Sequence, residues 1–85
     1  MIFFVYILQS MKDKRYYIGY TSNLEQRLIF HNNGLNTSTK NRRPLKLVYF
    51  EEVLSKSEAI KRERKIKSYK GGNEFKKLIN NGGVA

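Results

Sequence analysis

The chain has 85 residues, with 17 lysines and arginines against seven acidic residues, so its formal net charge is +10 at pH 7. This length provides material for one hydrophobic core and predicts a single domain over residues 1–85. Because the chain has no cysteine, disulfides and thiolate metal sites are excluded, and we expect a cytoplasmic protein. The apolar opening, MIFFVYIL, is too short to span a membrane and is a poor match to a signal peptide.

The positive charge is concentrated in the second half of the chain. Residues 1–37 carry four lysines and arginines against two acids, whereas residues 38–85 carry thirteen against five. This distribution is typical of small domains that bind polyanions, most often nucleic acid. A solvated basic face is the alternative, and charge alone does not distinguish a nuclease from a passive binder.

The first predicted elements form a hairpin. Residues 2–8, IFFVYIL, are β-branched and aromatic without alternation, which favours a central strand buried on both faces. The polar segment SMKDK is turn-like, and residues 15–21, RYYIGYT, again have strand composition. We therefore expect two antiparallel strands joined by this turn.

A helix and a third strand follow the hairpin. Ser22 and Glu25 have the spacing of a capping box, which predicts a helix over about residues 23–33. The polar, basic segment 36–44 ends in the only proline of the chain and indicates an exposed loop. Residues 45–53, LKLVYFEEV, have the composition of a third strand.

The remaining sequence predicts two more helices. Ser55 and Glu58 repeat the capping pattern at the start of SKSEAIKRERKIKSY. The inner stripe of this helix consists of Ala59, Ile60, Glu63 and Ile66. A Gly-Gly pair separates it from a short amphipathic helix, NEFKKLIN. The order β-β-α-β-α-α predicts an α+β fold, with helices flanking a three-stranded, largely antiparallel sheet.

Glu63 is the unusual residue of the second long helix, because it points inward with the apolar side chains. An unpaired buried carboxylate is costly, so this group must be protonated, paired with a cation or bound to a metal. A salt bridge to a nearby arginine and a metal site both fit the pattern.

Four further side chains carry chemistry at informative spacings. Arg27 and His31 lie one helical turn apart on the side that should face the sheet. The hairpin can place Tyr6 beside Tyr17, and Gly19 indicates a close approach to the backbone there. A structural histidine and a packed tyrosine pair are the alternatives. The arginine needs an anion, which is either a carboxylate or a phosphate.

These signals occur together in a pattern that resembles a known family. VYIL at residues 5–8, YIG at residues 17–19, the Arg27-to-His31 spacing and Glu63 in AIKRE resemble the GIY-YIG nuclease domain over nearly the whole chain. The chain is most similar to the small stand-alone bacterial members. The first motif reads FVY, so its tyrosine is kept while phenylalanine and valine replace glycine and isoleucine.

The resemblance implies a metal-dependent DNA endonuclease or nickase, directed by DNA structure and linked to repair or recombination. Glu63 would hold one divalent ion, Mg²⁺ or Mn²⁺. Tyr17 or Tyr6 would be the general base, and Tyr17 is the preferred choice. Arg27 would neutralise charge on the phosphate, and His31 is a possible proton acceptor.

The other acidic residues also favour one metal ion over two. Most of them fall at a turn or at helix starts, which leaves Glu51 and Glu52 as the only further candidates for metal ligands. We expect the loop residues Lys40, Arg42 and Arg43 to contact the backbone of DNA, including branched or flapped DNA. No membrane or small-molecule cofactor is expected. A non-catalytic nucleic-acid-binding module and a domain that binds an acidic protein are the alternatives.

Overall fold

The computed structural model describes residues 2–82, without the side chains of residues 81 and 82. Its elements in chain order are β1 (Phe3–Ser10), β2 (Tyr16–Thr21), α1 (Leu24–Asn32), the 3₁₀-helix η1 (Lys40–Arg42), β3 (Leu45–Val53), α2 (Lys56–Ser68) and α3 (Asn73–Gly82). The strands form an antiparallel sheet in the order β2-β1-β3, which confirms the α+β class and the central position of the first strand. None of the helices described is long and apolar enough to cross a bilayer.

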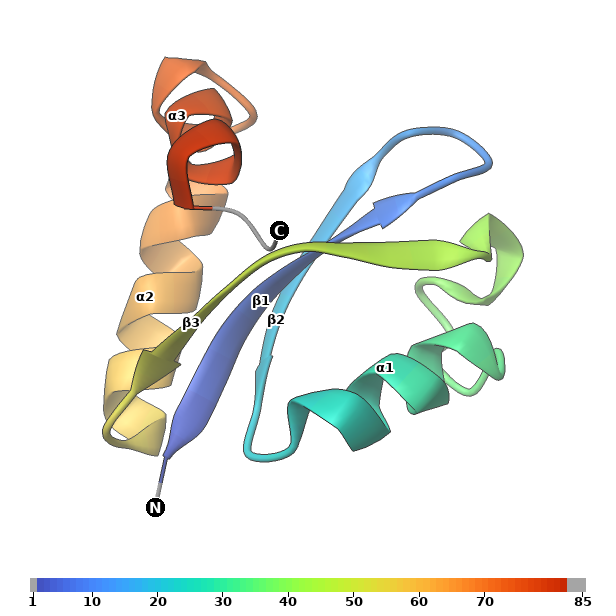
Figure 1. Cartoon of the computed structure of the whole chain (residues 1–85), viewed down its shortest axis with the longest axis horizontal. Coiled ribbons are helices and arrows are strands. Elements are labelled where there is room, and N and C mark those ends of the chain that lie inside the picture. The colour runs from blue at the N-terminus through green and yellow to red at the C-terminus, as the bar shows by residue number, and fades with distance from the viewer. Residues whose placement is uncertain (1, 83–85) are drawn as a thin grey trace.

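The sheet separates two clusters of buried side chains, with α1 on one side and α2 and α3 on the other (Figure 1). Successive side chains of β1 point to opposite faces. Val5 and Ile7 therefore join the cluster under α2 and α3, and both are fully buried. Tyr6 and Leu8 face α1 and pack with Leu45. One strand thus supplies both clusters.

The start of α1 differs from the sequence prediction. The side chain of Asn23, and not that of Ser22, caps the helix by accepting a hydrogen bond from the Gln26 amide at 3.1 Å. The amide of Asn23 donates to the hydroxyl of Thr21 at 3.1 Å. This turn at the end of β2 holds Asn23 in the extended conformation that a cap requires.

The segment 36–44 was expected to be an exposed loop, and this prediction is wrong in part. Residues 40–42 form η1, and Thr39 immediately before it is fully buried. The hydroxyl of Thr39 lies 2.8 Å from Nδ1 of His31, so its polar atom has a partner inside the protein. A hydrogen bond to α1 therefore draws this polar segment inward.

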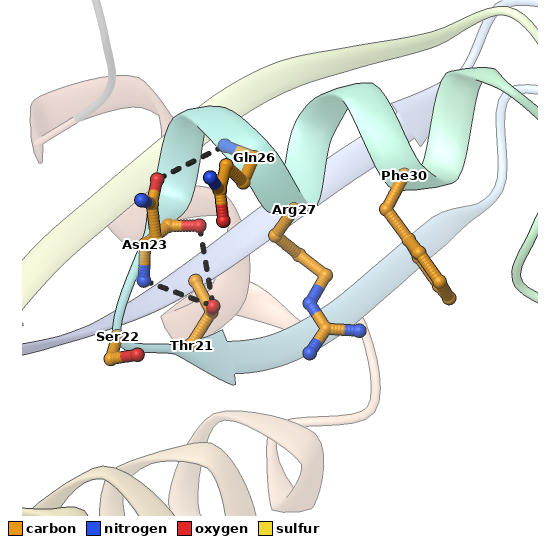
Figure 2. A pocket seen from close by; sticks show the side chains of 6 residues that line it. All are labelled: Thr21, Ser22, Asn23, Gln26, Arg27 and Phe30. Carbon is orange, nitrogen blue, oxygen red and sulfur yellow. Dashed lines mark hydrogen bonds between the residues drawn. The ribbon is translucent and has the colours of Figure 1, made fainter.

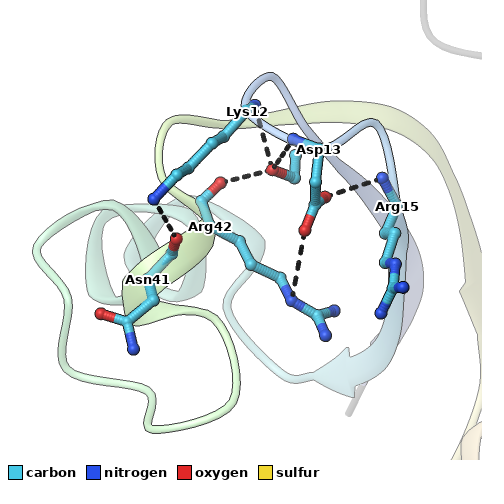
Figure 3. A network of polar contacts seen from close by, with 6 residues as sticks. Lys12, Asp13, Arg15, Asn41 and Arg42 are labelled. Carbon is cyan, nitrogen blue, oxygen red and sulfur yellow. Dashed lines mark hydrogen bonds and ion pairs between the residues drawn. The ribbon is translucent and has the colours of Figure 1, made fainter.

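A polar network joins η1 to the turn between β1 and β2 (Figure 3). The buried hydroxyl of Ser10 donates to the carbonyl oxygen of Arg42 at 2.6 Å and accepts from the Lys12 amide at 3.1 Å. Nε of Arg42 lies 3.7 Å from a carboxylate oxygen of Asp13, and Nζ of Lys12 donates to the carbonyl oxygen of Asn41 at 3.2 Å. Two basic segments far apart in sequence are thereby held side by side.

Candidate active site

The hairpin places two tyrosines on the α1 side of the sheet. Tyr6 is paired with Gly19 across the strands and Leu8 with Tyr17, so the two tyrosines are diagonal neighbours with ring centroids 6.4 Å apart. A Cβ atom on Gly19 would lie only 2.6 Å from Oη of Tyr6. The close approach that the glycine indicated is therefore made by the Tyr6 hydroxyl.

His31 connects this pair to the buried segment before η1. It is fully buried, its Nε2 lies 3.1 Å from Oη of Tyr6, and its Nδ1 lies 2.8 Å from Oγ1 of Thr39. Its ring centroid is 4.9 Å from that of Tyr17. Both ring nitrogens are thus engaged, which fixes the orientation of the imidazole. Sequence reasoning missed Thr39, because the polar run around it carries no signal of burial.

The surroundings of these groups favour their neutral forms. Burial, and then the positive charge of Arg27, lower the pKa of His31 below its ordinary value. Burial also raises the pKa of Tyr6, and the nearby phenol of Tyr17 and carboxylate of Glu63 add to this effect, while Arg27 opposes it. At neutral pH we therefore expect an uncharged imidazole hydrogen-bonded to an uncharged phenol.

Arg27 extends from α1 into a pocket of about 310 Å³. The pocket lies at the junction of β2 and α1 and is lined by Thr21, Ser22, Asn23, Gln26, Arg27 and Phe30 (Figure 2). The guanidinium carbon lies 5.0 Å from the centroid of the Phe30 ring. Among residues 2–82, no carboxylate lies within ion-pair distance of Arg27. The pocket therefore offers a positive charge to an anion such as phosphate.

Glu63 is largely buried on α2, with 17% of its side chain exposed. Its carboxylate lies 3.7 Å from Nζ of Lys67 on the next helical turn, so the cation beside it is a lysine and not one of the arginines. It is also close enough to Tyr6 to affect the pKa of that phenol. Glu63 is thus electrostatically coupled to Tyr6.

A metal ion at Glu63 would have few protein ligands. The part of the chain that the structure describes contains no cluster of three or more histidine, cysteine, aspartate or glutamate side chains suited to metal binding. Of the two further candidates for metal ligands, Glu51 is held by Nε of Arg62 at 2.8 Å. A single carboxylate oxygen donor fits Mg²⁺ or Mn²⁺, which can take its other ligands from water and phosphate.

The three basic loop residues differ in how free their side chains are. Lys40 is exposed, whereas Arg42 is half-buried and paired with Asp13. Nε of Arg43 donates to the carbonyl oxygen of Lys40 at 2.8 Å, and its guanidinium packs beside Gly34. The arginines therefore also stabilise the loop that carries them. The structure brings Tyr6, Tyr17 and His31 into contact. The basic loop is joined to this group by the hydrogen bond between Thr39 and His31.

Comparisons with known proteins show what the whole chain is similar to. A family model described as the GIY-YIG catalytic domain matches residues 2–76. A UPF0213 protein of Staphylococcus saprophyticus is 45% identical over 80 residues, which cover 93% of this chain and 95% of that protein. One of Clostridium perfringens is 51% identical over 65 residues, covering 75% and 69%. The solution NMR structure of a UPF0213 protein from Bacillus halodurans has a TM-score of 0.59 and 31% identity, covering 96% of this chain and 87% of that one.

Proposed function

Because the chain belongs to the GIY-YIG catalytic domain family, we propose that it is a DNA endonuclease or nickase that hydrolyses phosphodiester bonds. The observation that carries this proposal is the contact of Tyr6, Tyr17 and His31 on one face of the sheet. Phosphodiester hydrolysis needs an activated water, charge stabilisation at the phosphate and help for the departing oxygen. We take residues 1–85 as one catalytic domain that works in the cytoplasm.

Glu63 would hold one Mg²⁺ or Mn²⁺ ion, with water and phosphate oxygens as the remaining ligands. Such an ion supplies charge stabilisation at the phosphate and the leaving oxygen. Lys67 balances the carboxylate charge, since its ammonium group lies 3.7 Å away. Arg27 carries a second positive charge and would bind a phosphate oxygen as negative charge develops.

Tyr17 would take the proton from the attacking water. Tyr6 suits this role less, because its hydroxyl is bonded to His31 and burial raises its pKa. Tyr17 is only half-buried and lies beside the imidazole, with ring centroids 4.9 Å apart. A phenol works as a base near neutral pH only when positive charge stabilises its ionised form, and Arg27 is the candidate source of that charge.

DNA would lie along the basic loop, where Lys40, Arg42 and Arg43 would contact the phosphate backbone of the DNA. Such contacts position a duplex without reading its sequence, so we expect recognition of DNA structure, including branched or flapped DNA, and a role in repair or recombination. We also expect affinity to fall steeply with salt, because each neutralised phosphate releases counterions.

The test is cleavage of supercoiled plasmid and branched DNA with Mg²⁺ or Mn²⁺, beside EDTA and the variant Glu63→Gln. Glu58→Gln is a matched control, because it makes the same change at an exposed position of α2. We expect metal-dependent cutting by the parent chain and the control. In Glu63→Gln, the rate should fall at least about 100-fold while DNA affinity persists, since one charged group of a catalytic site is lost.

DNA affinity is measured in parallel by fluorescence anisotropy. Tight, salt-dependent binding by the parent chain without any cutting would support the non-catalytic nucleic-acid-binding module instead. If Glu63→Gln fails to fold and neither the parent chain nor any variant cuts DNA, the ion pair between Glu63 and Lys67 has a purely structural role.

A further inference from the structure

An apolar groove of about 560 Å³ lies outside the candidate active site, where the first turns of α1 face the start of β1 and the end of β3 (Figure 1). Phe50 is paired with Tyr6 across the strands, so it lies on the α1 side of the sheet, and Phe4 lies on the same side. The apolar lining consists of these two phenylalanines, whose ring centroids are 6.1 Å apart, with Leu24 and Leu28 of α1. We call this surface the α1–β3 groove.

Apolar surface continues beyond the α1–β3 groove. Phe50 in its lining is 38% exposed. Phe3 pairs with Val53 at this end of the sheet, and the residues just outside that pair, Ile2 and Leu54, are 47% and 83% exposed. Contiguous apolar surface is rarely left in water, and it commonly marks a site of protein association. The extension past the groove favours a polypeptide over a small molecule as its occupant.

The rim of the groove is acidic in a chain that carries 17 lysines and arginines. Glu25 of α1 and Glu52 of β3 are exposed, and both line the groove, whereas no lysine or arginine of residues 2–82 does. Neither carboxylate lies within ion-pair distance of a cation in that range. The acidic residues that do form ion pairs there are Asp13, Glu51, Glu63 and Glu74. The groove thus combines apolar surface with negative charge that nearby side chains leave uncompensated.

Glu58 is the remaining acidic residue without an ion pair within residues 2–82. Unlike the two glutamates of the groove, it lines a separate pocket together with Lys61, Arg62 and Lys65. Positive side chains therefore surround Glu58, although none of them reaches ion-pair distance. Its position makes it a control for the effect of charge alone.

We propose that the α1–β3 groove docks a segment of another protein that carries lysine or arginine side chains beside bulky apolar ones. The apolar side chains of this segment cover the two phenylalanines and two leucines of the groove, and its cations pair with Glu25 and Glu52. Amphipathic segments commonly occupy protein grooves in this way. The proposal concerns a surface outside the candidate active site and does not depend on the nuclease function.

Charge argues against two other occupants of the groove. The two carboxylates repel the phosphates of DNA, whereas the basic loop attracts them. A second copy of the chain brings another net charge of +10, and two such molecules repel each other. A basic segment on a partner of lower net charge meets the carboxylates without that repulsion.

The groove adjoins the pocket that holds Arg27. Ser22 and Asn23, in the turn between β2 and α1, line both of them (Figure 2). A segment docked in the groove therefore lies one turn of the chain away from the positive charge offered to phosphate. Its partner protein can reach the candidate active site from there without covering it.

The first test selects peptides from a phage-displayed library of random dodecapeptides. The library is depleted on the double variant Glu25→Gln and Glu52→Gln, which removes peptides that bind elsewhere, and is then selected on the parent chain. We expect enrichment of peptides with lysine or arginine beside leucine, isoleucine, phenylalanine or tryptophan. Absence of any enrichment, or enrichment of acidic peptides, would overturn the proposal.

The affinity of an enriched, synthesised peptide is then measured by fluorescence anisotropy. The groove double variant should bind it at least about 5-fold more weakly than the parent chain, because two charge pairs are lost. The matched control, Glu58→Gln with Glu74→Gln, removes two exposed carboxylates outside the groove and should bind like the parent. Equal weakening in both double variants would show that only net charge matters, which contradicts docking in the groove.

The apolar contribution is tested with Phe50→Ala. We expect it to weaken peptide binding at least about 5-fold, as for an aromatic side chain at the centre of an interface. Leu35→Ala is the control, because Leu35 is also an exposed apolar residue but lies outside the groove. Equal affinity of the two variants would count against the proposed surface.

NMR spectra of the ¹⁵N-labelled protein show that each variant is folded and where the peptide binds. In the parent chain, the peptide should shift the amide signals of Leu24, Leu28 and Phe50. Shifts confined to other parts of the protein would overturn the proposal. Groove signals that move with protein concentration in the absence of peptide would also overturn it, because the occupant would then be a second copy of the chain.

Discussion

The two faces of the sheet differ in what they bury. The face under α2 and α3 is filled by apolar side chains, among them Val5 and Ile7, whereas the face under α1 buries Tyr6, His31 and, beyond them, Thr39. Neighbouring residues of β1 therefore enter different environments, because side chains alternate along a strand. The α1 face therefore supplies the tyrosines and the histidine of the proposed site, while Glu63, the proposed metal ligand, comes from α2 on the other side of the sheet.

The largest change in stability is expected at the apolar face. Ile7→Ala should lower the free energy of unfolding by about 2–5 kcal/mol, since it removes buried methyl and methylene groups and leaves a cavity. Urea unfolding measures the loss, and Ile7→Val should cost about 0.5–1.5 kcal/mol. A loss of DNA cleavage with unchanged stability would show that the faces are not divided in this way.

Gly19→Ala should have a smaller effect on stability, at the other face. The new Cβ would meet Oη of Tyr6 at 2.6 Å, so the phenol must move, at a cost of about 1–3 kcal/mol. The hydrogen bond to His31 should weaken, which the imidazole NMR signals report. In a Tyr6→Leu background the same substitution should cost less, because Oη and Cζ, which the new Cβ would meet at 2.6 and 2.8 Å, are both gone. Equal costs in both backgrounds would mean that the strain lies elsewhere.

The smallest expected effect is the change in the free energy of unfolding with pH. Burial, and then the charge of Arg27, hold the pKa of His31 below its ordinary value of 6.5, which returns on unfolding. Between the two pKa values the unfolded chain binds more protons, so the free energy of unfolding rises with pH. This contribution is complete above the ordinary pKa and is lost as pH falls through the folded pKa. Urea unfolding from pH 5 to pH 8 should show a steeper rise for the parent chain than for His31→Gln; parallel curves would contradict it.

Much of the fold was predictable because local and tertiary preferences agree. The strands carry β-branched and aromatic residues, and the cap of α2 forms as expected, with the Glu58 amide donating to the Ser55 hydroxyl at 3.2 Å. The cap of α1 was predicted one residue too early. Ser22 and Asn23 are both good caps, and only the hydrogen bonds to Thr21 select the second.

Some contacts among the candidate residues were predictable, and others were not. The alternation of the hairpin and the helical spacing of Arg27 and His31 anticipated which side chains would meet. Thr39 could not be identified, because a threonine in a polar run is usually exposed and its burial depends on a contact with a distant helix. Of the two alternatives left open for Glu63, the salt bridge was expected with an arginine but forms with Lys67, since a helix rich in both lysine and arginine offers many equivalent cations.

The decisive measurement is single-turnover cleavage of branched DNA with Mg²⁺ by Tyr17→Phe and Tyr20→Phe. These tyrosines lie three residues apart on β2; Tyr17 packs with Tyr6 under α1, and Tyr20 packs with the cluster under α2 and α3. Each substitution removes one hydroxyl. We expect Tyr17→Phe to cut at least about 100-fold more slowly, as for loss of a general base, and Tyr20→Phe to cut at nearly the parent rate. Equal rates in the two variants, or no metal-dependent cutting by the parent chain, would contradict a nuclease site on the α1 face.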